Sequence, residues 1–112
     1  FMIICGGVNI YPQECENLLI THPQVADAAV FGVPNDDLGE EVKAVVQPMP
    51  GVAADEQFAQ ALIGFCRDHL APMKCPRSID FTEQLPRLPT GKLYKKPLRD
   101  AYWQGRGKSR IV

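Results

Sequence analysis

The chain has 112 residues, enough for one domain with a modest hydrophobic core. Hydrophobic residues make up 46% of it and charged residues 22%, as in an ordinary globular protein, and the net charge is −1. A charge balance this close to neutral gives no electrostatic footprint for nucleic acid or for an anionic membrane surface.

The first part of the chain predicts a hairpin followed by a helix. Two short apolar runs, residues 3–4 and 8–10, flank a Gly-Gly pair that can form a tight turn. Pro12 suits the first turn of a helix, and the apolar positions after it repeat at helical spacing up to His22. Pro23 then ends the helical run.

The middle of the chain predicts two strands. Residues 25–33 are β-branched or small, which indicates a strand that is mostly buried on both faces. A turn over residues 35–39 leads to residues 41–47, where apolar and polar side chains alternate. We therefore expect the second strand to run antiparallel to the first and to have one wetter face.

The second half predicts a helix, a short strand and a last short helix. Asp55 can cap a helix whose apolar stripe ends near His69, and His69 is expected to be a core or boundary residue. Residues 78–82 predict a strand, and Pro97 begins the last helix, after which residues 104–112 are expected to be a basic flexible tail. The pattern predicts an α+β fold, with a small antiparallel or mixed sheet of about three strands plus the N-terminal β-hairpin, covered by helices.

The four cysteines do not predict a metal site. Cys5, Cys15, Cys66 and Cys75 form no Cys-x-x-Cys pair, and only two histidines could join them as ligands. Cys15 and Cys66 fall on the apolar faces of predicted helices, where a thiol acts as a small hydrophobe. We expect all four thiols to be reduced, which points to the cytoplasm, and the sequence shows no signal peptide or transmembrane run.

Residues 85–96, Leu-Pro-Arg-Leu-Pro-Thr-Gly-Lys-Leu-Tyr-Lys-Lys, contain the lysine of most interest. Pro86 and Pro89 fix their own φ and favour extended geometry in the residues before them, whereas Gly91 can bend at positive φ. Lys92 therefore follows a loop that can aim a long cation at an anion. A lone Gly-Lys pair is more often an ordinary surface lysine after a turn, so the rest of the sequence decides between the two.

A second motif lies at the other end of the chain. Residues 3–16 read Ile-Ile-Cys-Gly-Gly-Val-Asn-Ile-Tyr-Pro-Gln-Glu-Cys-Glu, and further motifs cover residues 22–46 and 69–92. Together these motifs resemble the small C-terminal domain of the adenylate-forming acyl-CoA synthetases, over nearly the whole chain. The resemblance implies a C-terminal lid domain over residues 1–103, with the N-terminal domain of the enzyme absent from this sequence.

The resemblance implies a two-step reaction and a role for five residues. A carboxylate attacks the α-phosphate of ATP to give an acyl-adenylate and pyrophosphate, and the thiol of CoA then displaces AMP. Lys92 matches the adenylation lysine of the family, a compact cation that offsets the repulsion between the carboxylate and the triphosphate. Gly6 and Gly7 match the loop that meets the pantetheine arm of CoA. Arg77 and, more weakly, Lys74 match cations near the phosphates of CoA.

Without the resemblance, the same residues also allow purely structural interpretations. Gly6 and Gly7 suit a simple hairpin turn, and Arg77 and Lys74 suit a solvated rim. An adenylation domain that loads a carrier protein and a noncatalytic α+β interaction domain are the alternative functions.

The resemblance also implies partners. ATP and CoA are the expected co-substrates, the acid is expected to be fatty or related, and Mg²⁺ and the acyl pocket are expected in the N-terminal domain, so this chain alone should be inactive. Two residues depart from the family pattern. Phe1 stands where an Asp or Lys hinge residue is usual, and Leu38 replaces an aromatic residue, which weakens any role in adenine stacking.

Overall fold

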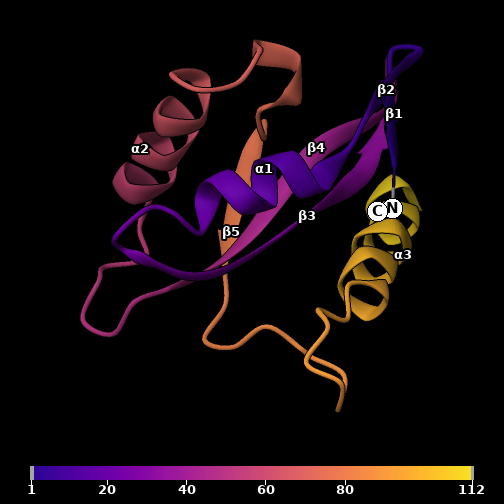
Figure 1. Ribbon diagram of the computed structural model, residues 1–112. Helices are drawn as coiled ribbons and strands as arrows, with labels where there is room; N and C mark the ends of the chain where they lie inside the picture. Colours follow the sequence, from indigo (N-terminus) through magenta and orange to yellow (C-terminus); the bar gives the residue numbers. More distant parts are fainter. Residues whose placement is uncertain (1, 112) are drawn as a thin grey trace.

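The computed structural model describes residues 2–111, with side chains through residue 104. Over these residues the chain forms five strands, three α-helices and one 3₁₀ turn. The elements are β1 (Ile3–Cys5), β2 (Val8–Ile10), α1 (Pro12–Leu19), β3 (Val25–Asn35), β4 (Gly39–Pro48), α2 (Glu56–Arg67), η1 (Pro72–Lys74), β5 (Ser78–Phe81) and α3 (Lys96–Ile111). Figure 1 shows a twisted sheet with α1 and α2 on one side and α3 on the other.

Strand β4 lies at the centre of the sheet. It pairs antiparallel with β3 along its whole length and parallel with β5, from Lys43 opposite Ser78 to Val46 opposite Phe81. The β1–β2 hairpin joins the same sheet through one pairing, between Cys5 and Gly39. The predicted α+β fold with a mixed sheet is therefore confirmed, and the hairpin extends the sheet instead of standing apart from it.

The sheet has a core on each face. The larger core lies under α1 and α2, and its buried members include Leu19, Val30 and Leu62. The second core contains Phe31, Val45 and Leu85, and side chains of α3 pack against it. Strand β3 is buried on both faces, as predicted, because each of its faces meets one of these cores.

The two faces of β4 differ in exposure as predicted: Val42, Ala44 and Val46 are buried, whereas Glu41, Lys43 and Gln47 are half-buried. The side chain of Lys43 is only 13% exposed, and it lies over the Tyr102 ring of α3 at 4.9 Å while pairing with Asp80 at 3.1 Å. The hydroxyl of Tyr102 also donates to the carboxylate of Asp80. The polar face is thus the wetter one, and α3 covers part of it, which alternation within one strand cannot indicate.

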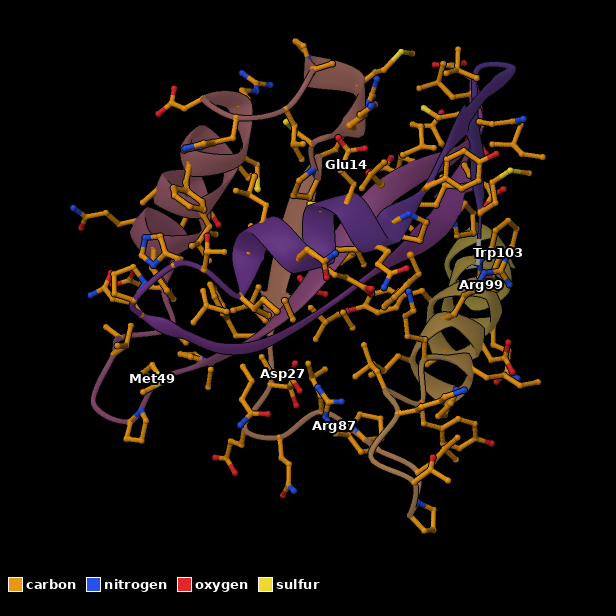
Figure 2. The ribbon with its side chains drawn as sticks, viewed as in Figure 1. Glu14, Asp27, Met49, Arg87, Arg99 and Trp103 are labelled. Carbon is orange, nitrogen blue, oxygen red and sulfur yellow. The ribbon has the colours of Figure 1, made fainter. Side chains whose placement is uncertain are left out.

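Helix α3 is fixed to β3 by its aromatic residues as well. The indole Nε1–H of Trp103 donates to the carbonyl of Gly32 at 3.0 Å, and the guanidinium of Arg99 lies 4.9 Å from the centre of the indole. Figure 2 shows Arg99 and Trp103 together on this helix. The helix continues through Ile111, past the short helix that the sequence predicted. The division into a lid domain over residues 1–103 and a flexible tail over 104–112 stays a prediction.

Two other helix boundaries test the predictions. The side chain of Asp55 accepts a hydrogen bond from the backbone N–H of Phe58 at 2.9 Å, so the expected cap of α2 is confirmed. Helix α1 ends at Leu19, earlier than expected. His22 lies beyond the helix, because a residue before proline is disfavoured in the helical region. Its ring packs edge-on against Phe65. Phe1, the residue at the expected hinge position, lies outside the described residues.

All four cysteines are free thiols and buried. The pKa of the Cys15 thiol is raised by its hydrogen bond with Cys66 and by burial, so this group stays protonated at neutral pH. Among the described residues, no group of three or more His, Cys, Asp or Glu side chains could hold a metal ion. None of the described helices combines the length and apolar character needed to span a bilayer.

Candidate functional site

Lys92 lies at the end of a tight turn between β5 and α3. The backbone N–H of Gly91 donates to the carbonyl of Leu88, and that of Leu88 donates to the carbonyl of Lys92, both at 2.8 Å. Pro89 occupies the second position of this turn, where its fixed φ is favourable, and Gly91 adopts a φ of +90°. The proline and glycine that the sequence analysis singled out therefore shape the turn that presents Lys92.

Side chains on both sides of this turn hold it to the sheet. Leu85 is only 2% exposed in the second core, and its N–H donates to the side-chain oxygen of Gln47 at 3.0 Å. After the turn, Lys95 is 11% exposed and binds the carboxylate of Glu16 at 2.7 Å and the carbonyl of Val30 at 2.9 Å. The lysine turn thus has a buried anchor on its N-terminal side and an ionic anchor on its C-terminal side.

The ammonium of Lys92 is exposed and has no hydrogen-bond or ion-pair partner among the described side chains. Its neighbours differ, since Lys95 is paired with Glu16 and Lys96 with Asp100 at 2.7 Å. Within this cationic segment, Lys92 is therefore the lysine whose charge is available to an anionic ligand.

Gly6 and Gly7 form the two-residue turn of the N-terminal hairpin. Their φ values are +57° and +82°, and Cys5 pairs with Val8 across the turn. Positive φ at both positions is the geometry for which glycine is preferred in such hairpins. A hydrogen bond holds the turn to the loop before β4: the N–H of Gly6 donates to the carbonyl of Leu38 at 2.9 Å. A Cβ on Gly7 would meet nothing within 4 Å, so the backbone there is open to an approaching molecule.

A pocket of about 620 Å³ lies beside the hairpin and brings two of the predicted residues together. Gly6 lines one part of it, and Arg77 lines another. Arg67, in the last turn of α2, lines the same pocket, although the sequence analysis did not single it out. Lys74 does not line this pocket, and its ammonium pairs with Glu14 at 3.2 Å.

The two predicted motifs lie at opposite ends of the domain. Figure 1 shows the β1–β2 turn at the top of the molecule and the loop before α3 at the bottom. Lys92 therefore does not meet Gly6, Gly7 or Arg77 in one site within this chain. The arrangement is one of two separate surfaces, each with its own exposed cation.

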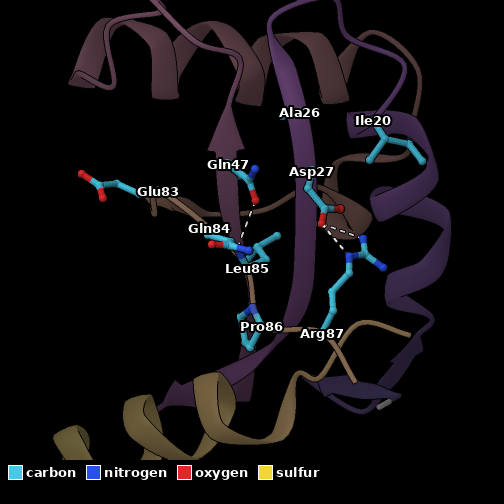
Figure 3. A pocket seen from close by; sticks show the side chains of 9 residues that line it. All are labelled: Ile20, Ala26, Asp27, Gln47, Glu83, Gln84, Leu85, Pro86 and Arg87. Atoms are coloured by element: carbon cyan, nitrogen blue, oxygen red, sulfur yellow. Dashed lines mark hydrogen bonds and ion pairs between the residues drawn. The ribbon is translucent and has the colours of Figure 1, made fainter. Parts of the chain in front are cut away.

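A wider groove of about 940 Å³ lies beside the loop that leads to Lys92. Figure 3 shows Asp27 and Gln47 on adjacent strands of this groove, with Arg87 directed toward Asp27. The sequence analysis missed Arg87, Lys95 and their carboxylate partners. No local pattern identifies these pairs, because Arg87 and Asp27 are 60 positions apart and Lys95 and Glu16 are 79 apart.

The comparisons with known proteins agree with the fold and the motifs. The family model for the AMP-binding enzyme C-terminal domain matches residues 14–92. The chain is 48% identical over 99 residues to a 7a-methyl-1,5-dioxo-octahydro-1H-inden-4-yl propanoyl:CoA ligase of Mycobacterium tuberculosis, covering 88% of this chain and 19% of that protein. It is 41% identical over 108 residues to a long-chain-fatty-acid–CoA ligase of Salmonella typhimurium, covering 96% of this chain and 18% of that protein.

A solved structure gives the same result. The crystal structure of a Brucella canis acyl-CoA synthetase matches with a TM-score of 0.90 and 36% identity, over 95% of this chain and 20% of that one. This chain thus spans about a fifth of the length of the proteins that it matches. The family model and these likenesses together show that the chain belongs to the family of AMP-binding enzyme C-terminal domains.

Proposed function

We propose that this chain is the mobile C-terminal lid domain of an ATP-dependent, AMP-forming acyl-CoA synthetase. The observation that carries the proposal is Lys92, an unpaired exposed cation on an anchored turn, in a chain whose relatives are named as CoA ligases. In this proposal Lys92 acts in the first half-reaction, and the surface around Gly6, Gly7 and Arg77 acts in the second.

In the first half-reaction a carboxylate oxygen attacks the α-phosphorus of ATP, and the bond to pyrophosphate breaks. Both reactants are anions, and further negative charge gathers on the phosphoryl oxygens as the new bond forms. A lysine ammonium placed at these oxygens stabilises that charge when it is greatest, which is the kind of interaction that contributes most to catalysis. Lys92 suits this role because no side chain in the described part of the domain neutralises it.

In the second half-reaction the sulfur of CoA attacks the acyl carbon of the adenylate, and AMP leaves. The pantetheine arm of CoA is thin, and a backbone without side chains lets it lie close. Gly7 offers such a backbone, since the space that its Cβ would occupy is open. Arg77 and Arg67 beside the neighbouring pocket are placed to meet phosphate groups of CoA, and Lys74 is a weaker candidate because Glu14 already pairs with it.

The positions of the two surfaces support a domain that turns between the steps. One active site in the large domain cannot meet both ends of the lid at once if those ends lie on opposite sides of it. We infer that the lid first presents Lys92 and then presents the Gly6–Gly7 turn. We expect the large domain to hold the Mg²⁺ that accompanies ATP.

The acid that is activated is not encoded in this domain. Relatives of similar identity are named for quite different acids: the fused-ring propanoate of the first, a long-chain fatty acid, and ferulate in an Amycolatopsis enzyme that is 45% identical over 98 residues. A domain shared among such enzymes serves the common chemistry of ATP and CoA. We place the enzyme in the cytoplasm, where both co-substrates are present.

The proposal is tested with the full-length enzyme that carries this domain. Carboxylate-dependent exchange of pyrophosphate into ATP should be measurable with at least one acid from a panel of fatty, aromatic and ring-bearing carboxylates. Titration with CoA and separately with a phosphopantetheinyl carrier protein then identifies the acceptor. Saturable consumption of CoA supports the proposal, and transfer to the carrier protein alone would make the chain part of a carrier-loading enzyme. No exchange with any carboxylate would favour a noncatalytic domain.

A further inference from the structure

One side chain joins the lysine turn to the sheet and also touches the peptide that leads into Lys92. The guanidinium of Arg87 donates from Nη2 and Nε to one carboxylate oxygen of Asp27, at 2.6 Å and 3.1 Å. Its third nitrogen, Nη1, donates to the carbonyl of Gly91 at 2.7 Å. Figure 2 shows Asp27 and Arg87 pointing toward one another, below the sheet in that view.

The geometry of arginine makes this double contact possible. A guanidinium is planar and presents its five N–H donors in fixed directions, so one side chain can bind a carboxylate on one edge and a carbonyl on another. Lysine has one nitrogen on a flexible stem and cannot hold two separated acceptors in the same way. Arg87 therefore acts as a clasp, which we define as the contacts from Arg87 to Asp27 and to Gly91.

The carboxylate end of the clasp is itself held in place. Asp27 has a side chain that is only 16% exposed, and its other oxygen accepts a hydrogen bond from the N–H of Ala28 at 2.9 Å. The pairing of β3 with β4 shifts register between Val25 and Asp27. Such an irregularity is a common means of redirecting a side chain from a sheet, and here it lies next to the residue that binds Arg87.

The carbonyl end of the clasp lies next to Lys92 in the chain. The oxygen of Gly91 belongs to the peptide unit whose nitrogen is that of Lys92, so the contact from Arg87 fixes the plane of that unit. Gly91 has the widest conformational freedom in the turn because it lacks a Cβ, and it adopts a φ of +90°. The side chain of Lys92 has no hydrogen bond or ion pair in the described structure, so we infer that its backbone sets its direction.

We propose that Arg87 and Asp27 are positioning residues for Lys92 in the adenylation half-reaction. The inference rests on the role proposed above for Lys92 and adds the device that directs it. Arg87 contacts no reacting atom in this proposal, and its effect passes through the Gly91–Lys92 peptide. Half-reactions that do not use Lys92 should therefore be indifferent to the clasp.

The test measures both half-reactions in the full-length enzyme. Arg87→Ala and the isosteric Asp27→Asn should slow acyl-adenylate formation between about tenfold and about a hundredfold, the loss that a small misplacement of a catalytic group produces. Formation of acyl-CoA from pre-made acyl-adenylate and CoA should change by less than about twofold. Asp100→Asn is the matched control, because it removes the carboxylate of the short ion pair between Lys96 and Asp100 in α3. It should leave both rates unchanged.

A charge exchange separates positioning from simple stability. The double variant Asp27→Arg with Arg87→Asp allows an opposite-charge pair at the same place but leaves no donor at position 87 for the carbonyl of Gly91. Its melting temperature should return toward that of the parent, whereas adenylation should stay slow. Recovery of full adenylation in the double variant would show that the ion pair alone matters, and it would overturn the positioning role.

The remaining outcomes are also decisive. Adenylation that stays within about twofold of the parent in both single variants, while Lys92→Ala abolishes it, overturns the clasp and leaves the proposed function intact. Equal loss of both half-reactions in Asp27→Asn overturns it as well, since that is the result of general damage to the domain. If Lys92→Ala itself spares adenylation, the proposed function and the clasp fail together.

Discussion

Three glycines of this domain adopt positive φ, so the same alanine substitution introduces the same backbone strain at three different sites. Gly7, Gly51 and Gly91 have φ values of +82°, +85° and +90°, and in each case a Cβ would meet nothing within 4 Å. Replacement by alanine therefore adds no collision at any of them. What it adds is the cost of holding an L-residue at positive φ, roughly 1–2 kcal/mol at each position.

The three alanine variants should lose similar stability but different activities. Each should lower the melting temperature of the 112-residue chain by a similar amount, on the order of 4–8 °C for each kcal/mol lost. In the full-length enzyme, Gly91→Ala should slow adenylate formation because the turn that carries Lys92 is altered. Gly7→Ala should slow transfer to CoA, because only this step brings the hairpin to the ligand. Gly51→Ala, in the loop between β4 and α2, should spare both steps.

The assay is the ratio of the two half-reaction rates, measured as pyrophosphate exchange and as acyl-CoA formation from pre-made adenylate. A stability loss common to all three variants cancels in that ratio. The reasoning would be refuted if Gly51→Ala changed the ratio as much as Gly7→Ala or Gly91→Ala does. It would also be refuted if all three variants lost both activities in proportion to their stability.

Three further predictions concern a buried leucine, an ion-paired carboxylate and the isolated chain. Leu85→Ala empties a buried position beneath the lysine loop and should cost about 2–5 kcal/mol in the free energy of unfolding, measured by urea titration; a loss below about 1 kcal/mol would show that this anchor is not tightly packed. Partial burial acts to raise the pKa of Asp80, but the hydrogen bond from Tyr102 and the ammonium of Lys43 hold this pKa below its ordinary value of 3.8. The ionised carboxylate therefore contributes stability above pH 3.8, and this contribution is lost as the pH falls through the lower folded pKa. Asp80→Asn should therefore weaken the acid dependence of stability below pH 3.8, and an unchanged pH profile of melting would contradict this assignment. Residues 1–112 alone should form no acyl-CoA from ATP, CoA and any carboxylate, and measurable product would show that the chain contains a complete active site.

The sequence predicted the parts of the fold that depend on local chemistry. Proline and glycine around Lys92 indicated a turn, and the structure has that turn, with Gly91 at positive φ. The strands of the middle segment followed from their β-branched run and their alternation, and Asp55 caps α2 as its position indicated. Each of these features is set by a residue and its near neighbours in the chain, so a single sequence is sufficient.

The features that the sequence did not predict depend on contacts between distant segments. Part of the polar face of β4 is covered because Tyr102 reaches Lys43 and Asp80 from another element. Arg87 and Lys95 were only two more cations near Lys92 until the structure gave them carboxylate partners on β3 and α1. Such pairings follow from the three-dimensional arrangement of the elements, which no spacing within one segment can report.

The sequence named the candidate site residues, but it did not indicate how they are arranged in space. Lys92, Gly6, Gly7 and Arg77 were named from motifs, and the structure shows Gly6 and Arg77 at one pocket with Lys92 at the far end of the domain. Lys74 differs from Arg77 in two respects: its ammonium pairs with Glu14, and it does not line the pocket. The opposite placement of the two motifs is the observation on which the proposed two orientations of the lid rest.

The most direct test of the central claim is the effect of Lys92→Ala on the two half-reactions of the full-length enzyme. Adenylate formation should fall on the order of 10²–10³-fold, the loss expected when a charge-stabilising donor is removed from a transition state. The same variant, supplied with pre-made acyl-adenylate and CoA, should form acyl-CoA at nearly the parental rate, because the lid then presents the Gly6–Gly7 turn. Equal loss of both rates in a variant that melts like the parent would contradict the role of Lys92 and the alternation of the two surfaces.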